Sequence, residues 1–128
     1  MSDKLAGIVL AHADVAAAFV SAVQAIAGTD HGLEPVSNDG CDRAGLSARL
    51  DAAIAGRATL IFADMPGGSC AFSAARYARG HDTVRVVTGV NLAMLLDFAF
   101  HRDQPLDVAA ARALETGRSS VTVVGGSA

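Results

Sequence analysis

Short apolar runs that alternate with segments of helical periodicity are the feature that most constrains the fold of this chain of 128 residues. The first run, Leu5–Leu10, precedes a segment of helical spacing that begins at Val15. Such continuous apolar runs are typical of parallel strands that are buried on both faces. We therefore predict a parallel sheet whose strands are joined by helices. The predicted strands are Leu5–Leu10, Leu33–Val36, Ala58–Ala63, Thr83–Val87 and Val121–Val124.

Helical patterns fill the intervals between these strands. The expected helices run from the N-cap Asp14 to Gly28, through Leu46, Leu50 and Ile54 to Gly56, from Ser69 to Arg79, from Asn91 to His101, and from Leu106 to Thr116 before Gly117. The expected inner faces carry Val15, Phe19, Val23 and Ile26 in the first helix, and Phe72 and Ala75 in the third. The pattern predicts one α/β domain over residues 1–128, with a doubly wound, mostly parallel sheet covered by helices on both faces. The direction of the last strand stays open.

Composition limits the classes of partner. The formal net charge is −3, with 52% hydrophobic and 18% charged residues. A basic surface for nucleic acid or for an anionic membrane is not expected, and the apolar excess favours burial against another subunit. Polar residues interrupt the apolar N-terminal stretch, so we expect neither a signal peptide nor a membrane span. Cys41 and Cys70 are expected to be reduced thiols in a cytoplasmic protein.

Polar residues at the ends of two predicted strands are the candidate site. His12 follows the first strand and Asp64 follows the third, and these two strands commonly lie side by side in a doubly wound sheet. Gly67 and Gly68 let the backbone approach a ligand, and Ser69 begins a helix whose N-terminus attracts anions. A nucleophilic imidazole, an orienting carboxylate and a phosphate-binding helix start together favour phosphoryl transfer through a phosphohistidine.

Simpler roles remain open for several of these residues. Asp64 could be a helix cap, the two glycines could form an ordinary turn, and Asn91 is more consistent with a helix cap than with a ligand contact. We assign no function to His31, His81 and His101, for which solvent exposure or contact with a helix end is expected, nor to Cys41. No cysteine and histidine spacing matches a zinc motif, and glycine-rich nucleotide motifs are absent. We therefore expect neither a metal nor a cofactor.

Three motifs in order resemble one protein family over essentially the whole chain. Asp64–Ser69, Gly89–Leu95 and Glu115–Arg118 are similar to segments of the mannose-type (mannose, fructose and sorbose) enzyme IIA component of the bacterial phosphoenolpyruvate-dependent sugar phosphotransferase system. The chain departs from that family where Ala11 and Ala13 flank the histidine in place of a hydroxyl residue and glycine. It also departs at Met65, Pro66 and Cys70.

The resemblance implies a cytoplasmic phosphocarrier. His12 would accept a phosphoryl group from the phosphocarrier protein HPr and pass it to a IIB domain or protein on a separate chain, with contact to the membrane only through a permease complex. Asp64 would hold the histidine, and Ser69 would help to bind phosphate. The family also implies a homodimer in which Val121–Val124 is exchanged and pairs antiparallel. Two alternatives remain: a regulatory module controlled by the phosphorylation state of His12, and the related subunit that serves dihydroxyacetone phosphorylation.

Overall fold

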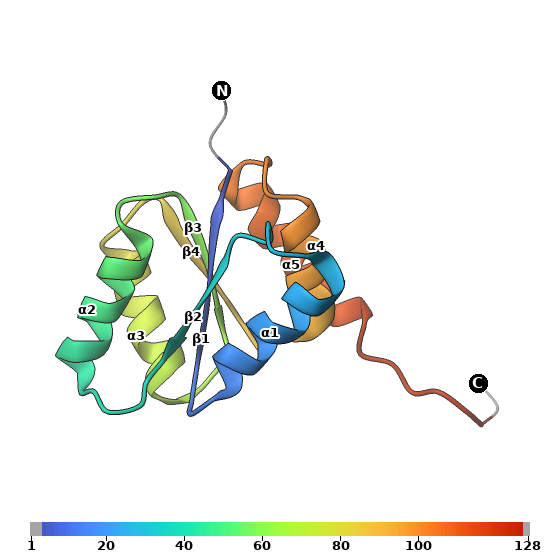
Figure 1. Ribbon diagram of the computed structural model, residues 1–128, viewed down its shortest axis with the longest axis horizontal. Helices are drawn as coiled ribbons and strands as arrows, with labels where there is room; N and C mark the ends of the chain where they lie inside the picture. The colour runs from blue at the N-terminus through green and yellow to red at the C-terminus, as the bar shows by residue number, and fades with distance from the viewer. Residues whose placement is uncertain (1–3, 127–128) are drawn as a thin grey trace.

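The computed structural model describes residues 4–126, which form a four-stranded sheet covered by helices on both faces (Figure 1). This arrangement confirms the predicted α/β class with a parallel sheet and five helices. The strands are β1 (Ala6–Ala11), β2 (Leu33–Ser37), β3 (Thr59–Ala63) and β4 (Val84–Thr88). The helices are α1 (Val15–Ala27), α2 (Arg43–Ile54), α3 (Gly68–Arg79), α4 (Leu92–Phe100) and α5 (Leu106–Ser119).

The strand order β2-β1-β3-β4 makes the sheet doubly wound, and each pair of neighbours is parallel. The chain passes from β1 outward to β2, then crosses back to β3 and β4. The winding direction therefore reverses between β1 and β3, where α/β proteins bind ligands at the carboxyl ends of the strands. In the register of this pair Leu10 lies beside Ala63. Both strands end at the lower edge of the sheet in Figure 1.

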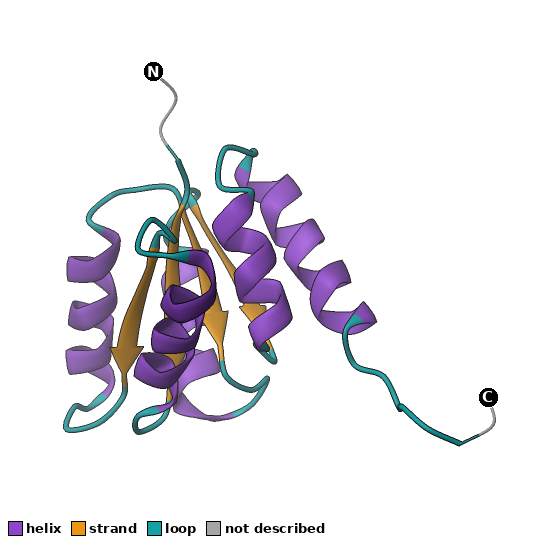
Figure 2. Ribbon diagram, turned by 45° about the vertical axis from the view of Figure 1, so that its right-hand side comes forward, coloured by secondary structure: helices purple, strands orange, loops and turns teal. Residues whose placement is uncertain are grey.

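Two hydrophobic cores account for the continuous apolar runs. α1, α4 and α5 cover one face of the sheet and α2 and α3 cover the other (Figures 1 and 2). Along β1 the side chain of Val9 enters the first core, whereas Ile8 and Leu10 enter the second. A strand that is buried on both faces needs apolar side chains at every position, because alternate residues point to opposite faces.

The inner faces of two helices differ in part from the prediction: Val23 and Phe19 of α1 pack into the core as expected, but other residues expected there are exposed. In α1 the side chains of Val15 and Ile26 are 41% and 62% exposed, while Ala16 and Val23 are buried. In α3 Phe72 is 51% exposed, and the buried face carries Cys70, Ala74 and Tyr77, together with Ala71 and Ser73. Small residues thus make up much of both buried faces, together with Val23 in α1 and Tyr77 in α3. Phe72 instead packs against the guanidinium of Arg43 from α2, 5.0 Å from its ring centre.

α5 continues past Gly117, where we expected it to end, and reaches Ser119. Gly117 is buried, and a Cβ atom at this position would overlap the terminal methyl of Met94. Asn91 caps α4 as expected, because its Oδ1 accepts a hydrogen bond from the backbone N–H of Met94 at 3.1 Å. Its Nδ2 donates to the carbonyl of Gly117 at 3.0 Å. The glycine therefore serves a close contact between α4 and α5 rather than a helix stop.

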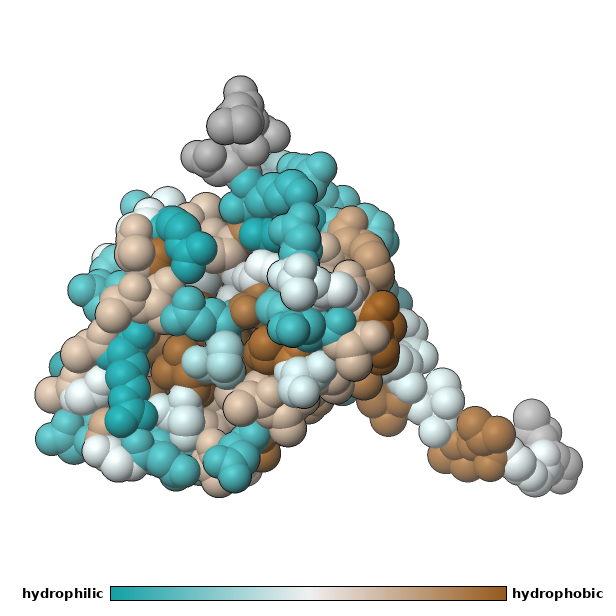
Figure 3. Space-filling model, viewed as in Figure 1, coloured by the Kyte–Doolittle hydropathy of each residue, from teal (hydrophilic) through white to brown (hydrophobic). Residues whose placement is uncertain are grey.

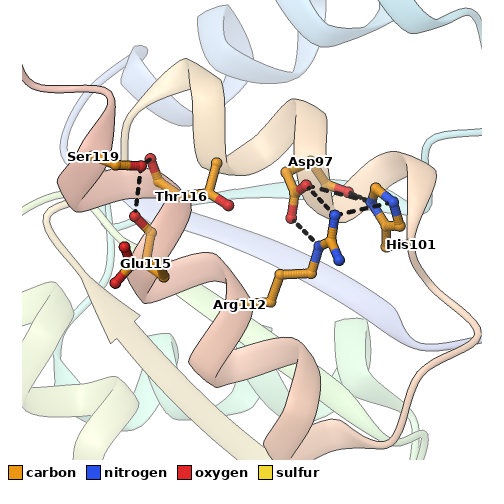
Figure 4. A network of polar contacts seen from close by, with 6 residues as sticks. All are labelled: Asp97, His101, Arg112, Glu115, Thr116 and Ser119. Carbon is orange, nitrogen blue, oxygen red and sulfur yellow. Dashed lines mark hydrogen bonds and ion pairs between the residues drawn. The ribbon is translucent and has the colours of Figure 1, made fainter.

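A polar network also joins these two helices (Figure 4). Arg112 of α5 donates to both carboxylate oxygens of Asp97 of α4, at 2.9 and 3.0 Å. The Nη2 atom of Arg112 also lies 3.1 Å from Nε2 of His101, whose Nδ1 contacts the carbonyl of Asp97 at 2.8 Å. Such a bidentate pair fixes orientation as well as distance, so the α4–α5 unit is held by polar contacts outside the core.

The other histidines divide into two groups. His101 meets the C-terminal end of α4, and His81 meets that of α3 through the carbonyl of Tyr77 at 2.8 Å, as expected. His31 is buried, whereas we expected either solvent exposure or contact with a helix end. Its Nδ1 accepts a hydrogen bond from the backbone N–H of Leu33 at 3.0 Å, which satisfies one ring nitrogen as the chain enters β2.

Residues 121–124 form no strand, although their valines gave a strand pattern. Val121, Val123 and Val124 are 76%, 95% and 92% exposed. The segment leads away from the body of the molecule, and apolar residues lie along it (Figures 1 and 3). A strand requires a neighbouring strand that pairs with its backbone groups, and residues 4–126 contain none for this segment, so the predicted exchange remains a prediction. In the same residues no helix has the length and apolar character needed to cross a membrane.

Candidate active site

The parallel pairing of β1 and β3 places His12 and Asp64 in direct contact. Each residue follows the end of its strand. One carboxylate oxygen, Oδ2 of Asp64, accepts a hydrogen bond from the backbone N–H of His12 at 3.0 Å and lies 2.7 Å from Nδ1 of its ring. The imidazole is 40% exposed and the Asp64 side chain is 15% exposed. The carboxylate is therefore largely buried, whereas the imidazole is accessible to solvent.

The carboxylate of Asp64 is held in its ionised form. Burial by itself would raise the pKa of Asp64, but the hydrogen bonds from the side chain and backbone of His12 and the charge of the imidazole outweigh it. The net effect places the pKa below the ordinary value of 3.8. An ionised carboxylate only accepts hydrogen bonds, so the proton between the two side chains belongs to Nδ1. Nε2 then carries the lone pair of the neutral ring.

Gly68, the first residue of α3, lies next to this reactive side of the imidazole. A Cβ on Gly68 would lie 3.4 Å from Cε1 of His12 and 3.6 Å from Nε2. The backbone of Gly68 has φ +92°, a conformation that favours glycine. Gly67 occupies the N-cap position of α3 and offers no side-chain cap. Unpaired backbone N–H groups at the helix start therefore remain available to an anion beside His12.

Ser69 lies at the same helix start, where the side chain of the residue that follows β2 meets it. Nδ2 of Asn38 donates to Oγ of Ser69 at 3.3 Å. Because Asn38 supplies the donor, this contact does not use the hydroxyl hydrogen of Ser69. We did not single out Asn38 from the sequence. It follows the end of β2 by one residue, so the rule that drew attention to His12 and Asp64 would also have found it.

The residues on either side of His12 have different surroundings. Ala11 ends β1 and is fully buried. Ala13 is exposed and has φ +50°, a left-handed conformation that costs an alanine about 1–2 kcal/mol. The hydroxyl of Ser37 donates to the carbonyl of Ala13 at 2.8 Å and holds this turn. Asp14 occupies the N-cap position of α1 but its side chain makes no capping hydrogen bond, which corrects the role expected for it.

Cys70 lies beneath the site, and both cysteines are free thiols. Burial and, second, the nearby charge of Asp64 raise the pKa of Cys70 to about 11. The thiol is therefore protonated and unreactive as a nucleophile at neutral pH. The second oxygen of Asp64, Oδ1, is also buried and has no hydrogen-bond partner in the part of the chain that the structure describes. The carboxylate thus has one oxygen bound to His12 and one unused.

The family of phosphotransferase system (PTS) proteins described as "PTS system fructose IIA component" matches residues 7–114. Among solved structures, the chain is similar to the mannose/sorbose specific IIA subunit of the phosphotransferase system from Enterococcus faecalis. The identity is 26%, the TM-score is 0.86, and the match covers 98% of each chain. No curated protein matches the chain.

Two further structures share the fold at lower identity. The phosphotransferase system component EIIA from Streptococcus agalactiae is 17% identical with a TM-score of 0.86, and the match covers 93% of this chain and 96% of the other. A sigma-54 interaction domain protein from Enterococcus faecalis is 14% identical with a TM-score of 0.76, and covers 94% and 95%. At these identities the likeness concerns the architecture of the sheet and helices alone.

The carboxyl pKa of Asp64 tests the pair directly. We expect a carbon NMR titration of the wild-type side chain to give a pKa below 3.8. In His12→Ala the side-chain hydrogen bond and the imidazole charge are lost, so the pKa should rise, whereas His101→Ala should leave it unchanged. A lowered folded-state pKa means that the pair stabilises the protein fully above pH 3.8, and that this contribution is lost as pH falls through the folded value. If the pKa of Asp64 were the same in His12→Ala as in the wild type, the assigned contact would be wrong.

Proposed function

The chain belongs to the EIIA-man family of phosphotransferase-system IIA components, and from this membership we propose that it is a cytoplasmic phosphocarrier. His12 accepts a phosphoryl group from HPr and passes it to a IIB domain or protein for sugar uptake and phosphorylation. The observation that carries the proposal is the 2.7 Å contact between Nδ1 of His12 and Asp64, which leaves the lone pair on Nε2 beside the start of α3.

The proposed transfer is a direct displacement. The Nε2 lone pair attacks phosphorus, the bond from phosphorus to the donor nitrogen breaks, and the electron pair of that bond returns to the donor. The proton on Nδ1 stays in place, because Asp64 holds it and stabilises the positive charge that develops on the ring. Transfer to the acceptor repeats the same steps in the opposite sense. The ring therefore needs no separate general base.

The start of α3 supports the same proposal from the side of the phosphate. Phosphoryl transfer depends mainly on positioning and on neutralising charge on the phosphoryl oxygens. Hydrogen-bond donors are available at this helix start: the backbone N–H groups after Gly67 and the hydroxyl of Ser69. Gly68 lets the backbone come close to His12. Their helix also directs the positive end of its dipole to this position.

A homodimer completes the proposal. The exposed valines at 121, 123 and 124 present an extended apolar segment, and β4 is an edge strand of the sheet. An edge strand has unpaired backbone groups that a segment from another chain can satisfy. We infer that residues 121–124 pair with a second copy of the chain.

A regulatory role is the second candidate. The sigma-54 interaction domain protein shares the fold, which favours a domain whose phosphorylation controls a partner, but at 14% identity this support is weaker than that for a phosphocarrier. Both functions use His12 in the same way. They differ in whether the phosphoryl group reaches a IIB protein.

Phosphorylation of His12 is the central expected outcome. Incubation with phosphoenolpyruvate, enzyme I and HPr should add one acid-labile phosphate, detected by intact mass, to the wild type and to His101→Ala but not to His12→Ala. Addition of IIB proteins should then discharge it. A phosphate that survives the His12→Ala change would refute the proposal, and stable phosphorylation that no IIB protein discharges would favour regulation.

Asn38 should act through Ser69. A hydrogen bond contributes about 0.5–1.5 kcal/mol, so Asn38→Ala should slow phosphorylation of His12 by about 2- to 10-fold. In a Ser69→Ala background the same change should have no further effect, because its hydroxyl partner is already gone. Asp39→Ala, an exposed neighbour, is the matched control. Equal effects of Asn38→Ala in both backgrounds would show that Asn38 acts independently of Ser69.

The exchange of the C-terminal segment predicts the oligomeric state. Light scattering after size exclusion should give a dimer for the full chain and for a chain that ends after residue 124. A chain that ends after residue 120 should be monomeric, since it lacks the valine segment. A dimer that persists without residues 121–128 would place the interface elsewhere.

A further inference from the structure

Three side chains with metal-binding atoms meet at the candidate active site, and two of them are the pair His12 and Asp64. A ring nitrogen of His12, a carboxylate oxygen of Asp64 and Sγ of Cys70 all lie within 4.8 Å of one another. They come from the ends of β1 and β3 and from the first turn of α3. Among residues 4–126 this is the one group of three such side chains that the structure brings together.

The carboxylate has an unused oxygen in this group. Asp64 makes both of its contacts with His12 through Oδ2. Oδ1 is buried and unpartnered in the part of the chain that the structure covers, and a buried carboxylate oxygen without a donor is unfavourable. A cation would satisfy it. Cys70 adds a fully buried sulfur from the helix below.

We propose that His12, Asp64 and Cys70 bind a divalent ion of the zinc type. Histidine nitrogen, carboxylate oxygen and cysteine sulfur are all ligands that Zn²⁺ binds, whereas Mg²⁺ and Ca²⁺ select oxygen ligands. Three protein ligands leave the fourth tetrahedral position for water. The number of protein ligands is therefore the same as in catalytic zinc sites, which keep one position open.

The geometry requires only a small movement. Ligand bonds of about 2.0–2.3 Å around a tetrahedral ion place the donor atoms roughly 3.3–3.8 Å apart. The three donor atoms are separated by at most 4.8 Å, so the widest pair must approach by at most about 1 Å, whereas Nδ1 of His12 and Oδ2 of Asp64, now 2.7 Å apart, must separate slightly if both are ligands. Only Ser69 separates Cys70 from Gly67 and Gly68, and glycines let this part of the backbone adjust more easily than the strands. On binding, the thiol proton passes to solvent, because a metal-bound thiol is deprotonated.

Metal binding and phosphorylation exclude each other, a consequence that rests on the proposed function. Neutral imidazole has a single nitrogen lone pair, and the other nitrogen carries a proton. If the ion binds Nε2, it occupies the nucleophile. If it binds Nδ1, the proton moves to Nε2 and removes the lone pair there. In either case the metal-bound ring cannot accept a phosphoryl group.

The test uses Co²⁺ as a spectroscopic probe of the unphosphorylated chain. Wild type should bind one ion and show the near-ultraviolet charge-transfer absorption of a cobalt–thiolate bond. Cys70→Ala should lose this absorption and bind at least about 10-fold more weakly, since even residues that only orient ligands contribute that much. Cys41→Ala, the other free cysteine, should bind as wild type does. Absence of the absorption in wild type, or its retention in Cys70→Ala, overturns the proposal.

A second variant shows whether a loss of metal binding is due to misfolding. A competition assay separates the metal site from the proposed function. His12 is partly exposed, so His12→Gln should fold normally, as circular dichroism will show, and should also weaken Co²⁺ binding. Zn²⁺ should block phosphorylation of wild type by HPr but not of Cys70→Ala at the same concentration, and a chelator should restore it. If Co²⁺ binds but His12 is never phosphorylated, the metal site stands and the proposed function fails. If phosphorylation occurs without metal binding, the reverse holds.

Discussion

The parallel pairing of β1 with β3 is the constraint on which the site depends. Leu10 and Ala63 lie side by side in the register, so His12 and Asp64 leave the sheet at the same edge. Both strands are fully buried, and a slip of one residue would turn each apolar side chain toward the opposite core. The 2.7 Å contact between imidazole and carboxylate is therefore set by the interior of the protein rather than by a surface loop. The reactive group therefore follows directly from a strand that is buried on both faces.

The same constraint explains what the sequence could predict. A strand buried on both faces must be apolar throughout, so β1 and β3 are visible as runs, and the first polar residue after each run marks the edge of the sheet. His12 and Asp64 are such residues. Their contact follows from the general topology of doubly wound sheets, without knowledge of any individual side-chain packing. The family resemblance then supplied a specific chemistry for an arrangement that many α/β proteins share.

Features that depend on contacts between distant elements were not predictable in this way. Phe72 has the hydrophobicity of a core residue, yet small residues of α3 face the sheet and Phe72 packs against Arg43 instead. Gly117 has the local signature of a helix stop, but its real role is a close approach to Met94. Residues 121–124 have the strand pattern, but residues 4–126 contain no partner strand for them. In each case the deciding interaction lies outside the window of sequence that carries the signal.

The flanks of His12 show how one such long-range contact can replace a local one. The imidazole is oriented by Asp64 through the ring and through the backbone of the same residue, so its position does not require a hydroxyl at residue 11. Ala11 is fully buried, where an unpaired hydroxyl would be unfavourable. Ala13 adopts a backbone conformation suited to glycine, and the hydrogen bond from Ser37, about 0.5–1.5 kcal/mol, offsets part of its strain. The two alanines therefore alter the conformational free energy of the turn after β1. The carboxylate that follows the neighbouring strand β3 still determines which ring nitrogen of His12 is free.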